Sequence, residues 1–169
     1  MKSEAKKEIR STIITICIVI IAFIISKYIF STVIVQGKSM EPNYKNNNLL
    51  LINRTPIYTP KRFDVVVFKF KNITLIKRVI GIPGDTVYIN KNGNILINGK
   101  ILKENYGKEI IQIRGDMTEP IKLKNEEYFV LGDNRNRSLD SRFKMVGNIK
   151  QDKIIGVVFY KLVGKTTLF

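Results

Sequence analysis

Ser39 and Lys77 are the residues whose types and settings could do chemistry. The sequence contains no His, and its only Cys, Cys17, lies inside an apolar run. A Ser-His-Asp triad, a Cys-His nucleophile, a zinc cluster and an intramolecular disulfide are therefore excluded. A serine activated by a neutral lysine remains. Such a lysine needs a pKa well below its usual value of about 10.4, which requires burial in an apolar setting.

The local sequence around each residue fits this chemistry. Ser39 lies between Gly37, which permits a close backbone approach, and Pro42, which restricts the exit of the chain. Lys77 lies in the strand-like run 74–81, where alternation places it on one face with Leu75 and Val79. Position alone leaves simpler alternatives open, namely a serine that forms a turn and a lysine that protects a sheet edge.

Four separated segments resemble the motif set of the type I signal peptidases and occur in the family's order. They are Gly-Lys-Ser-Met-Glu-Pro at 37–42, Asp-Val-Val-Val-Phe at 64–68, Lys-Arg-Val-Ile-Gly-Ile-Pro-Gly-Asp at 77–85, and Gly-Asp-Asn-Arg through Ser-Leu-Asp-Ser-Arg at 132–142. The resemblance implies that Ser39 is the nucleophile and Lys77 the general base. It also implies a serine endopeptidase that needs no cofactor or metal and cleaves signal peptides of exported preproteins after small residues.

The last motif implies supporting roles for three more residues. The Ser138 hydroxyl would bond to the lysine amine and orient it, while Asp140 and Arg142, two apart on one strand face, would pair and stabilise that wall. The alternative for this pair is an ion pair on the surface. Val35 and Met40 are candidates for the substrate pocket, although Met40 could equally pack in the core or contact the membrane.

Three positions depart from the family pattern. Asn43 stands where Thr is usual, and Phe63 stands where Gly is usual. Position 37 is Gly where some members carry a Ser whose hydroxyl completes the oxyanion hole, so we expect the hole to depend on the Ser39 backbone N–H. Residues 133–135 are interpreted as a polar turn that supports the site.

An apolar run begins near the N-terminus. Residues 12–26 carry no charge, and extension to Phe30 gives about nineteen residues, or roughly 28 Å as a helix. Lys2, Lys6, Lys7 and Arg10 precede the run, which favours a cytoplasmic N-terminus. A cleaved signal peptide would need small residues after the run, and none follow in that pattern; a buried core helix is the other alternative. We expect a cytoplasmic segment at 1–11, an anchor in the cell membrane at 12–30 and an extracytoplasmic protease domain at 31–169.

Short β-branched runs broken by Asn, Gly and Pro fill the rest of the chain. The predicted strands are 31–35, 49–53, 64–70, 74–80, 86–90, 95–97, 127–131 and 154–162. Asn92-Gly93 predicts a hairpin between two of them. The fold class is therefore mainly β: a signal-peptidase-like antiparallel β domain with one N-terminal transmembrane helix.

The formal charge of +15 predicts attraction to something anionic, and we expect an anionic lipid membrane rather than nucleic acid. Wall polymer and an ordinary solvated basic surface are alternatives, and the sequence carries no signal for oligomeric state. A Ser-Lys autoprotease of the DNA-damage repressor type would carry a helix-turn-helix where this chain has an apolar run. An inactive scaffold of the same fold is disfavoured because Ser39, Lys77 and Ser138 are all present.

Overall fold

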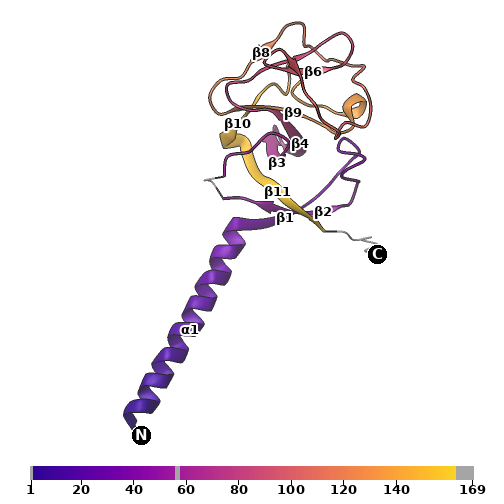
Figure 1. Ribbon diagram of the computed structural model, residues 1–169. Coiled ribbons are helices and arrows are strands. Elements are labelled where there is room, and N and C mark those ends of the chain that lie inside the picture. The colour runs from indigo at the N-terminus through magenta and orange to yellow at the C-terminus, as the bar shows by residue number, and fades with distance from the viewer. Residues whose placement is uncertain (1, 56–57, 163–169) are drawn as a thin grey trace.

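The computed structural model describes residues 2–55 and 58–162, with side chains from residue 6 onward. Helix α1, Lys2–Ile29, projects from a β body, and its apolar side chains do not pack on that body (Figure 1). Its stretch Lys6–Ile29 is long and apolar enough to cross a membrane. Phe30, which the sequence analysis placed in the anchor, is instead the first residue of β1. Helix and sheet therefore join without a linker.

The larger sheet has seven strands in the order β1-β2-β11-β3-β4-β9-β10, and every adjacent pair is antiparallel. Its strands are β1 Phe30–Ile34, β2 Leu49–Asn53, β3 Val65–Phe70, β4 Ile73–Gly81, β9 Glu127–Leu131, β10 Ile149–Lys150 and β11 Ile154–Leu162. β3 is central and is buried from Val65 to Phe68, which explains its continuous run of apolar residues. Alternate β3 residues enter two different core clusters, with Val65 and Val67 in one and Val66 and Phe68 in the other.

A smaller sheet of four strands lies at the end of the body opposite α1 (Figure 1). It has the order β7-β6-β5-β8, with β5 Thr86–Ile89, β6 Ile95–Ile97, β7 Lys100–Ile101 and β8 Ile121–Lys122. β5 and β6 form the hairpin predicted at Asn92-Gly93, where Gly93 has a φ of 78°. The chain leaves the large sheet after β4 and returns to it at β9. Two short 3-10 helices, η1 Arg135–Arg137 and η2 Gln151–Lys153, complete the body.

The prediction of a mainly antiparallel β fold with one N-terminal apolar helix is confirmed. All eight predicted strands are present, and each of their limits agrees with the prediction or differs from it by one residue. β7, β8 and β10 were not predicted from the sequence. Each has two residues, and so short a run cannot display alternation.

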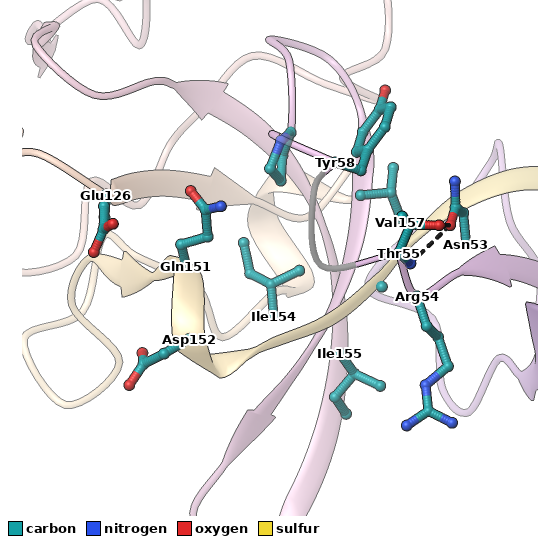
Figure 2. Close-up of a pocket in the computed structure, with 12 residues that line it drawn as sticks. Asn53, Arg54, Thr55, Tyr58, Glu126, Gln151, Asp152, Ile154, Ile155 and Val157 are labelled. Atoms are coloured by element: carbon teal, nitrogen blue, oxygen red, sulfur yellow. Dashed lines mark hydrogen bonds between the residues drawn. The ribbon is translucent and has the colours of Figure 1, made fainter. Parts of the chain in front are cut away.

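A cavity of about 400 Å³ lies where β2 ends and β11 begins (Figure 2). Its wall includes Tyr58, Glu126 and Gln151. None of the residues predicted to do chemistry line this cavity.

Candidate active site

Ser39 is held in the loop that joins β1 to β2. Gly37 has a φ of 89°, a backbone conformation that favours glycine, and its N–H donates to Asn46 Oδ1 at 2.8 Å. Met40, directly after the serine, is 1% exposed and packs in the core cluster beneath the loop. The Tyr44 N–H donates to the Met40 carbonyl at 2.8 Å. A buried side chain and local hydrogen bonds thus fix the position of Ser39.

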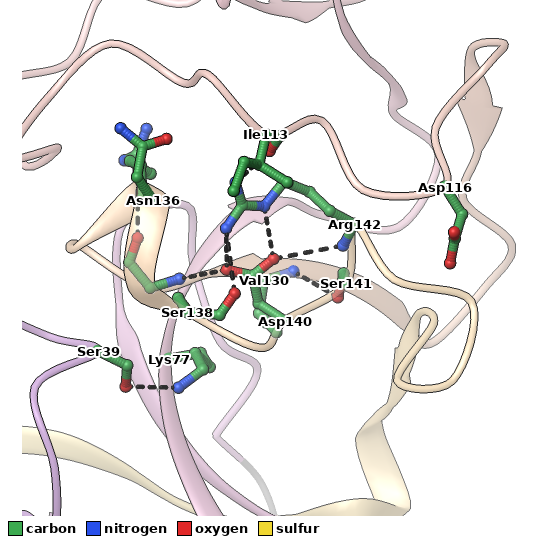
Figure 3. A network of polar contacts seen from close by, with 12 residues as sticks. Ser39, Lys77, Ile113, Asp116, Val130, Asn136, Ser138, Asp140, Ser141 and Arg142 are labelled. Atoms are coloured by element: carbon green, nitrogen blue, oxygen red, sulfur yellow. Dashed lines mark hydrogen bonds and ion pairs between the residues drawn. The ribbon is translucent and has the colours of Figure 1, made fainter.

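Lys77 lies in β4, directly before the segment that pairs with β9, and opposite Val66 of β3. Its side chain is buried, with 2% of the residue exposed. The sheet brings Lys77 Nζ to 2.7 Å from Ser39 Oγ, across 38 residues of sequence (Figure 3). The two residues singled out by their chemistry are therefore in hydrogen-bond contact.

Burial lowers the pKa of Lys77 from 10.5 to about 8. Arg142 lowers this pKa further by repulsion, while the Asp140 and Asp133 carboxylates oppose the change. With a pKa near 8, an appreciable fraction of the amine is neutral at neutral pH. A neutral amine beside a hydroxyl can accept its proton.

The predicted hydrogen bond from the Ser138 hydroxyl to the Lys77 amine is not formed. Ser138 Oγ is buried and has no hydrogen-bond partner within the described residues. Its neighbour is Gly132, where an added Cβ would lie 2.2 Å from Ser138 Oγ and 2.5 Å from the Ser39 carbonyl oxygen. The hydroxyl therefore packs beside the backbone of the Ser39 loop, at a point where only glycine fits.

Asp140 and Arg142 form an ion pair of 2.8 Å in which both side chains are buried, at 0% and 1% exposure (Figure 3). The alternative of a surface pair is wrong. The strand assignment is also wrong, because the two residues lie in the turn after Ser138 and not in a strand. Asp140 Oδ2 also accepts the Gly132 N–H at 3.0 Å, and Arg142 donates to the Ile113 carbonyl at 2.7 Å. The pair thereby holds together the two ends of the loop above Lys77.

A second buried ion pair was not predicted from the sequence. Arg78 donates to both oxygens of Asp133, with distances of 2.8 and 2.6 Å, and its guanidinium lies 3.8 Å from the centre of the Tyr106 ring. Asn43, the departure from the usual Thr, donates to Asp133 Oδ2 at 2.9 Å. The only signal for this cluster is that Arg78 follows Lys77 and that Asp133 lies in the last motif. Spacing alone does not reveal a contact across 55 residues.

A cleft of about 620 Å³ opens beside the Ser39 and Lys77 pair. Val35 and Met40, the two predicted pocket residues, line it together with both members of the pair. They are also buried in the core cluster, with exposures of 3% and 1%. For Met40, core packing and contact with the cleft are therefore both true. Within the described ranges, no group of three or more His, Cys, Asp or Glu residues is arranged to hold a metal ion.

A family profile described as signal peptidase, peptidase S26, matches residues 8–163. The chain belongs to this family. The signal peptidase I P of Bacillus subtilis subsp. natto is 39% identical over 158 residues, which cover 85% of this chain and 84% of that protein. The signal peptidase I S of Bacillus subtilis strain 168 is 37% identical over an alignment of 177 positions, which covers 95% of each protein. A crystal structure of a signal peptidase I from Enterococcus faecalis V583 has 32% identity and a TM-score of 0.49, covering 61% of this chain and 99% of that one.

Membership of the signal peptidase family confirms the predicted enzyme class, a serine endopeptidase. The predicted family resemblance is confirmed as well. The single apolar helix at the N-terminus, together with this family, fits a single-pass membrane protein.

Proposed function

We propose that this signal peptidase cleaves signal peptides from preproteins with Ser39 as nucleophile and Lys77 as general base. The observation that carries the proposal is the 2.7 Å contact between Ser39 Oγ and the buried Lys77 Nζ. The lowered pKa of Lys77, about 8, supports the same assignment because a general base must be unprotonated before it acts.

The reaction has two halves. When Lys77 is neutral, the Ser39 hydroxyl donates its hydrogen bond to Nζ, and the proton passes to Lys77 as Oγ attacks the scissile carbonyl carbon. The tetrahedral intermediate collapses to an ester on Ser39, and Lys77 returns the proton to the departing amine of the mature protein. Water then gives a proton to Lys77 as it attacks the ester carbon. When the second tetrahedral intermediate collapses, Lys77 returns this proton to Ser39 Oγ, which releases the signal peptide and restores both residues.

The oxyanion of the intermediate needs a donor. The Ser39 N–H makes no hydrogen bond to any residue in the parts of the chain that the structure describes. It is therefore free to bind a substrate carbonyl oxygen. The Gly37 N–H is already bonded to Asn46, so it supplies no second donor in this conformation.

We assign the cleft of about 620 Å³ to the residues before the cut. Its walls come from β1 and β4, between which an extended peptide can lie beside strand backbone. Val35 and Met40 are rigid there because they are also core residues. Because these two side chains cannot move aside, the cleft should accept only small substrate side chains near the cut.

We assign α1 to the cell membrane, with the basic N-terminal segment in the cytoplasm and the body outside. The basic residues before the apolar run support this orientation. Anionic lipid is the partner that a protein of charge +15 fits at the membrane surface.

Cleavage of a purified preprotein in detergent by wild type, Ser39→Ala and Lys77→Ala tests the dyad. We expect cleavage by wild type alone. Ser31→Ala and Lys69→Ala are matched controls on β1 and β3, outside the cleft, and should cleave normally. Retained cleavage by either dyad variant excludes the mechanism, and inactivity of correctly folded wild type favours a scaffold role.

A further inference from the structure

One buried side chain holds the peptide unit that joins Lys38 to Ser39. Asn134 is 2% exposed, and its Nδ2 donates to the Lys38 carbonyl oxygen at 3.0 Å. Its backbone N–H donates to the Ser39 carbonyl oxygen, also at 3.0 Å. The same residue therefore binds the carbonyl before Ser39 and the carbonyl after it.

This contact, together with a longer one at 3.2 Å from the Glu41 N–H to the same Lys38 oxygen, sets the direction of the Ser39 N–H. In a trans peptide unit the C=O and the N–H point in opposite directions, and the Lys38 C=O and the Ser39 N–H belong to one unit. Because Asn134 binds the Lys38 oxygen, the Ser39 N–H points away from Asn134. We propose that Asn134 is a positioning residue, which orients the Ser39 N–H as the oxyanion donor. This inference depends on the proposed function, because it assigns Ser39 as the nucleophile.

Before Ser39, the chain is held by the hydrogen bond from the Gly37 N–H to Asn46 Oδ1 and not by side-chain packing at Gly37. Gly37 is exposed, and no atom lies within 4 Å of the position that a Cβ would take there. The family's optional hydroxyl donor is also missing at this position, so the oxyanion depends on one backbone N–H. Small errors in the direction of that donor are then not compensated by a second one.

The residues on either side of Asn134 hold it firmly. Asp133 is paired with Arg78, and Arg135 is paired with Glu104 at 2.7 Å. Arg135 also donates to the Gly132 carbonyl at 3.0 Å. A segment fixed by two ion pairs can impose its geometry on the exposed loop that it binds.

The test compares Asn134→Ala and Asn134→Asp with wild type. The first removes the donor, and the second replaces it with a carboxylate that repels the Lys38 oxygen. We expect kcat for the preprotein to fall about tenfold to a hundredfold, somewhat less than for outright loss of an oxyanion donor. KM should stay within about twofold. The affinity of a peptide boronic acid, which forms a tetrahedral adduct on the serine, should fall in proportion to kcat.

Asn136→Ala is the matched control, because Asn136 lies on the same loop and its amide donates to the Ile110 carbonyl at 3.0 Å and not to the nucleophile loop. Its kcat should be that of wild type, while its loss of thermal stability should be similar to that of Asn134→Ala. Unchanged kcat in both Asn134 variants overturns the inference. A second result also overturns it: activity falls only as much as the number of active sites that the boronate can titrate, and the sites that remain bind the boronate with wild-type affinity. If Ser39→Ala still cleaves or binds the boronate, the proposed function fails instead.

Discussion

At position 77 the fold holds a lysine that is 2% exposed and pairs with no carboxylate among the described residues. The two buried carboxylates that act on it, Asp133 and Asp140, are each bonded to an arginine. Their charges are therefore largely neutralised by these pairs. A cation in a dry site without a partner of its own loses its proton easily, which is the property that a general base needs.

Cleavage should depend on pH in the direction set by this lysine. Only neutral Lys77 accepts the serine proton, so kcat/KM should rise as the pH increases through about 8. A series of rate measurements between pH 6 and pH 10, with folding monitored at each point, checks this. A rate already constant at pH 6, or a rise confined to the region of pH 10, contradicts the assignment.

Lys77→Met should stabilise the protein while abolishing cleavage. The pKa of Lys77 falls from 10.5 to about 8 on folding, so the unfolded chain binds more protons between these values. The free energy of unfolding therefore decreases as the pH falls from 10.5 to 8. Below pH 8 the buried lysine lowers it by about 3 kcal/mol relative to its value above pH 10.5. Urea unfolding at pH 7 should show a gain of about that size for Lys77→Met, and the gap should shrink as the pH approaches 10.5. A variant less stable than wild type at pH 7 would refute this account.

Ser138 and Ser141 form a contrasting pair of buried hydroxyls. Ser138 Oγ has no partner among the described residues, whereas Ser141 Oγ accepts the Val130 N–H at 3.0 Å. Ser141→Ala should cost about 1 to 3 kcal/mol of unfolding free energy because it leaves a buried donor unpaired. Ser138→Ala should cost nothing or stabilise slightly. A larger loss for Ser138→Ala in denaturant unfolding would reveal a hydrogen bond that this conformation lacks.

Among the elements, the long strands were predictable because their side chains alternate or are continuously apolar. β2, β6, β9 and β11 have the predicted limits. The two-residue strands were not predictable, since a run of two residues shows no alternation and pairing with neighbouring strands creates them. Asp140 and Arg142, two apart, were expected to share one strand face, and the structure forms a turn there instead.

The residues of the candidate site also fall into those that the sequence predicted and those that it did not. Family motifs predicted Ser39, Lys77 and the pairing of Asp140 with Arg142, because each lies within a short recognisable segment. The contacts of Asp133 and Asn134 could not be predicted, since they arise only where the last motif meets the loop after β1. The missing hydrogen bond of Ser138 reflects the same limit, because its geometry depends on how two distant loops pack.

The turn after Ser138 should depend strongly on its ion pair. Asp140→Asn leaves Arg142 buried without its counter-charge, and we expect a loss of about 3 to 5 kcal/mol in unfolding free energy. Asp152→Asn is the control, because Asp152 and Lys153 are 62 to 68% exposed and their charged atoms are 3.9 Å apart. That change should have no measurable effect. If the two substitutions changed thermal stability equally, burial would not explain why the Asp140 and Arg142 pair matters for stability.

On the scale of the whole molecule, the helix and the small sheet lie at opposite ends of the body (Figure 1). The orientation proposed for the membrane follows from the basic N-terminal segment. Cys17 is the only cysteine, so a Cys17→Ala background allows single-cysteine labelling. In intact cells, a membrane-impermeant maleimide should label Lys100→Cys on β7 and leave Lys6→Cys unlabelled. The reverse pattern would place the body in the cytoplasm.

The direct join of α1 to β1 sets how far the reactive serine can stand from the bilayer. Ser39 lies nine positions after Phe30, and β1 is fixed along its whole length to β2. Even fully extended, nine residues span roughly 30 Å, and the loop is far from extended. With Ser39 as the proposed nucleophile and α1 in the membrane as proposed, substrate chains would present their scissile bond at a nearly constant height above the lipid surface. A flexible linker inserted after Ile29 would relax this restriction. The join would thus select peptide bonds by their height above the membrane, while the cleft would select them by the size of the side chains before the cut.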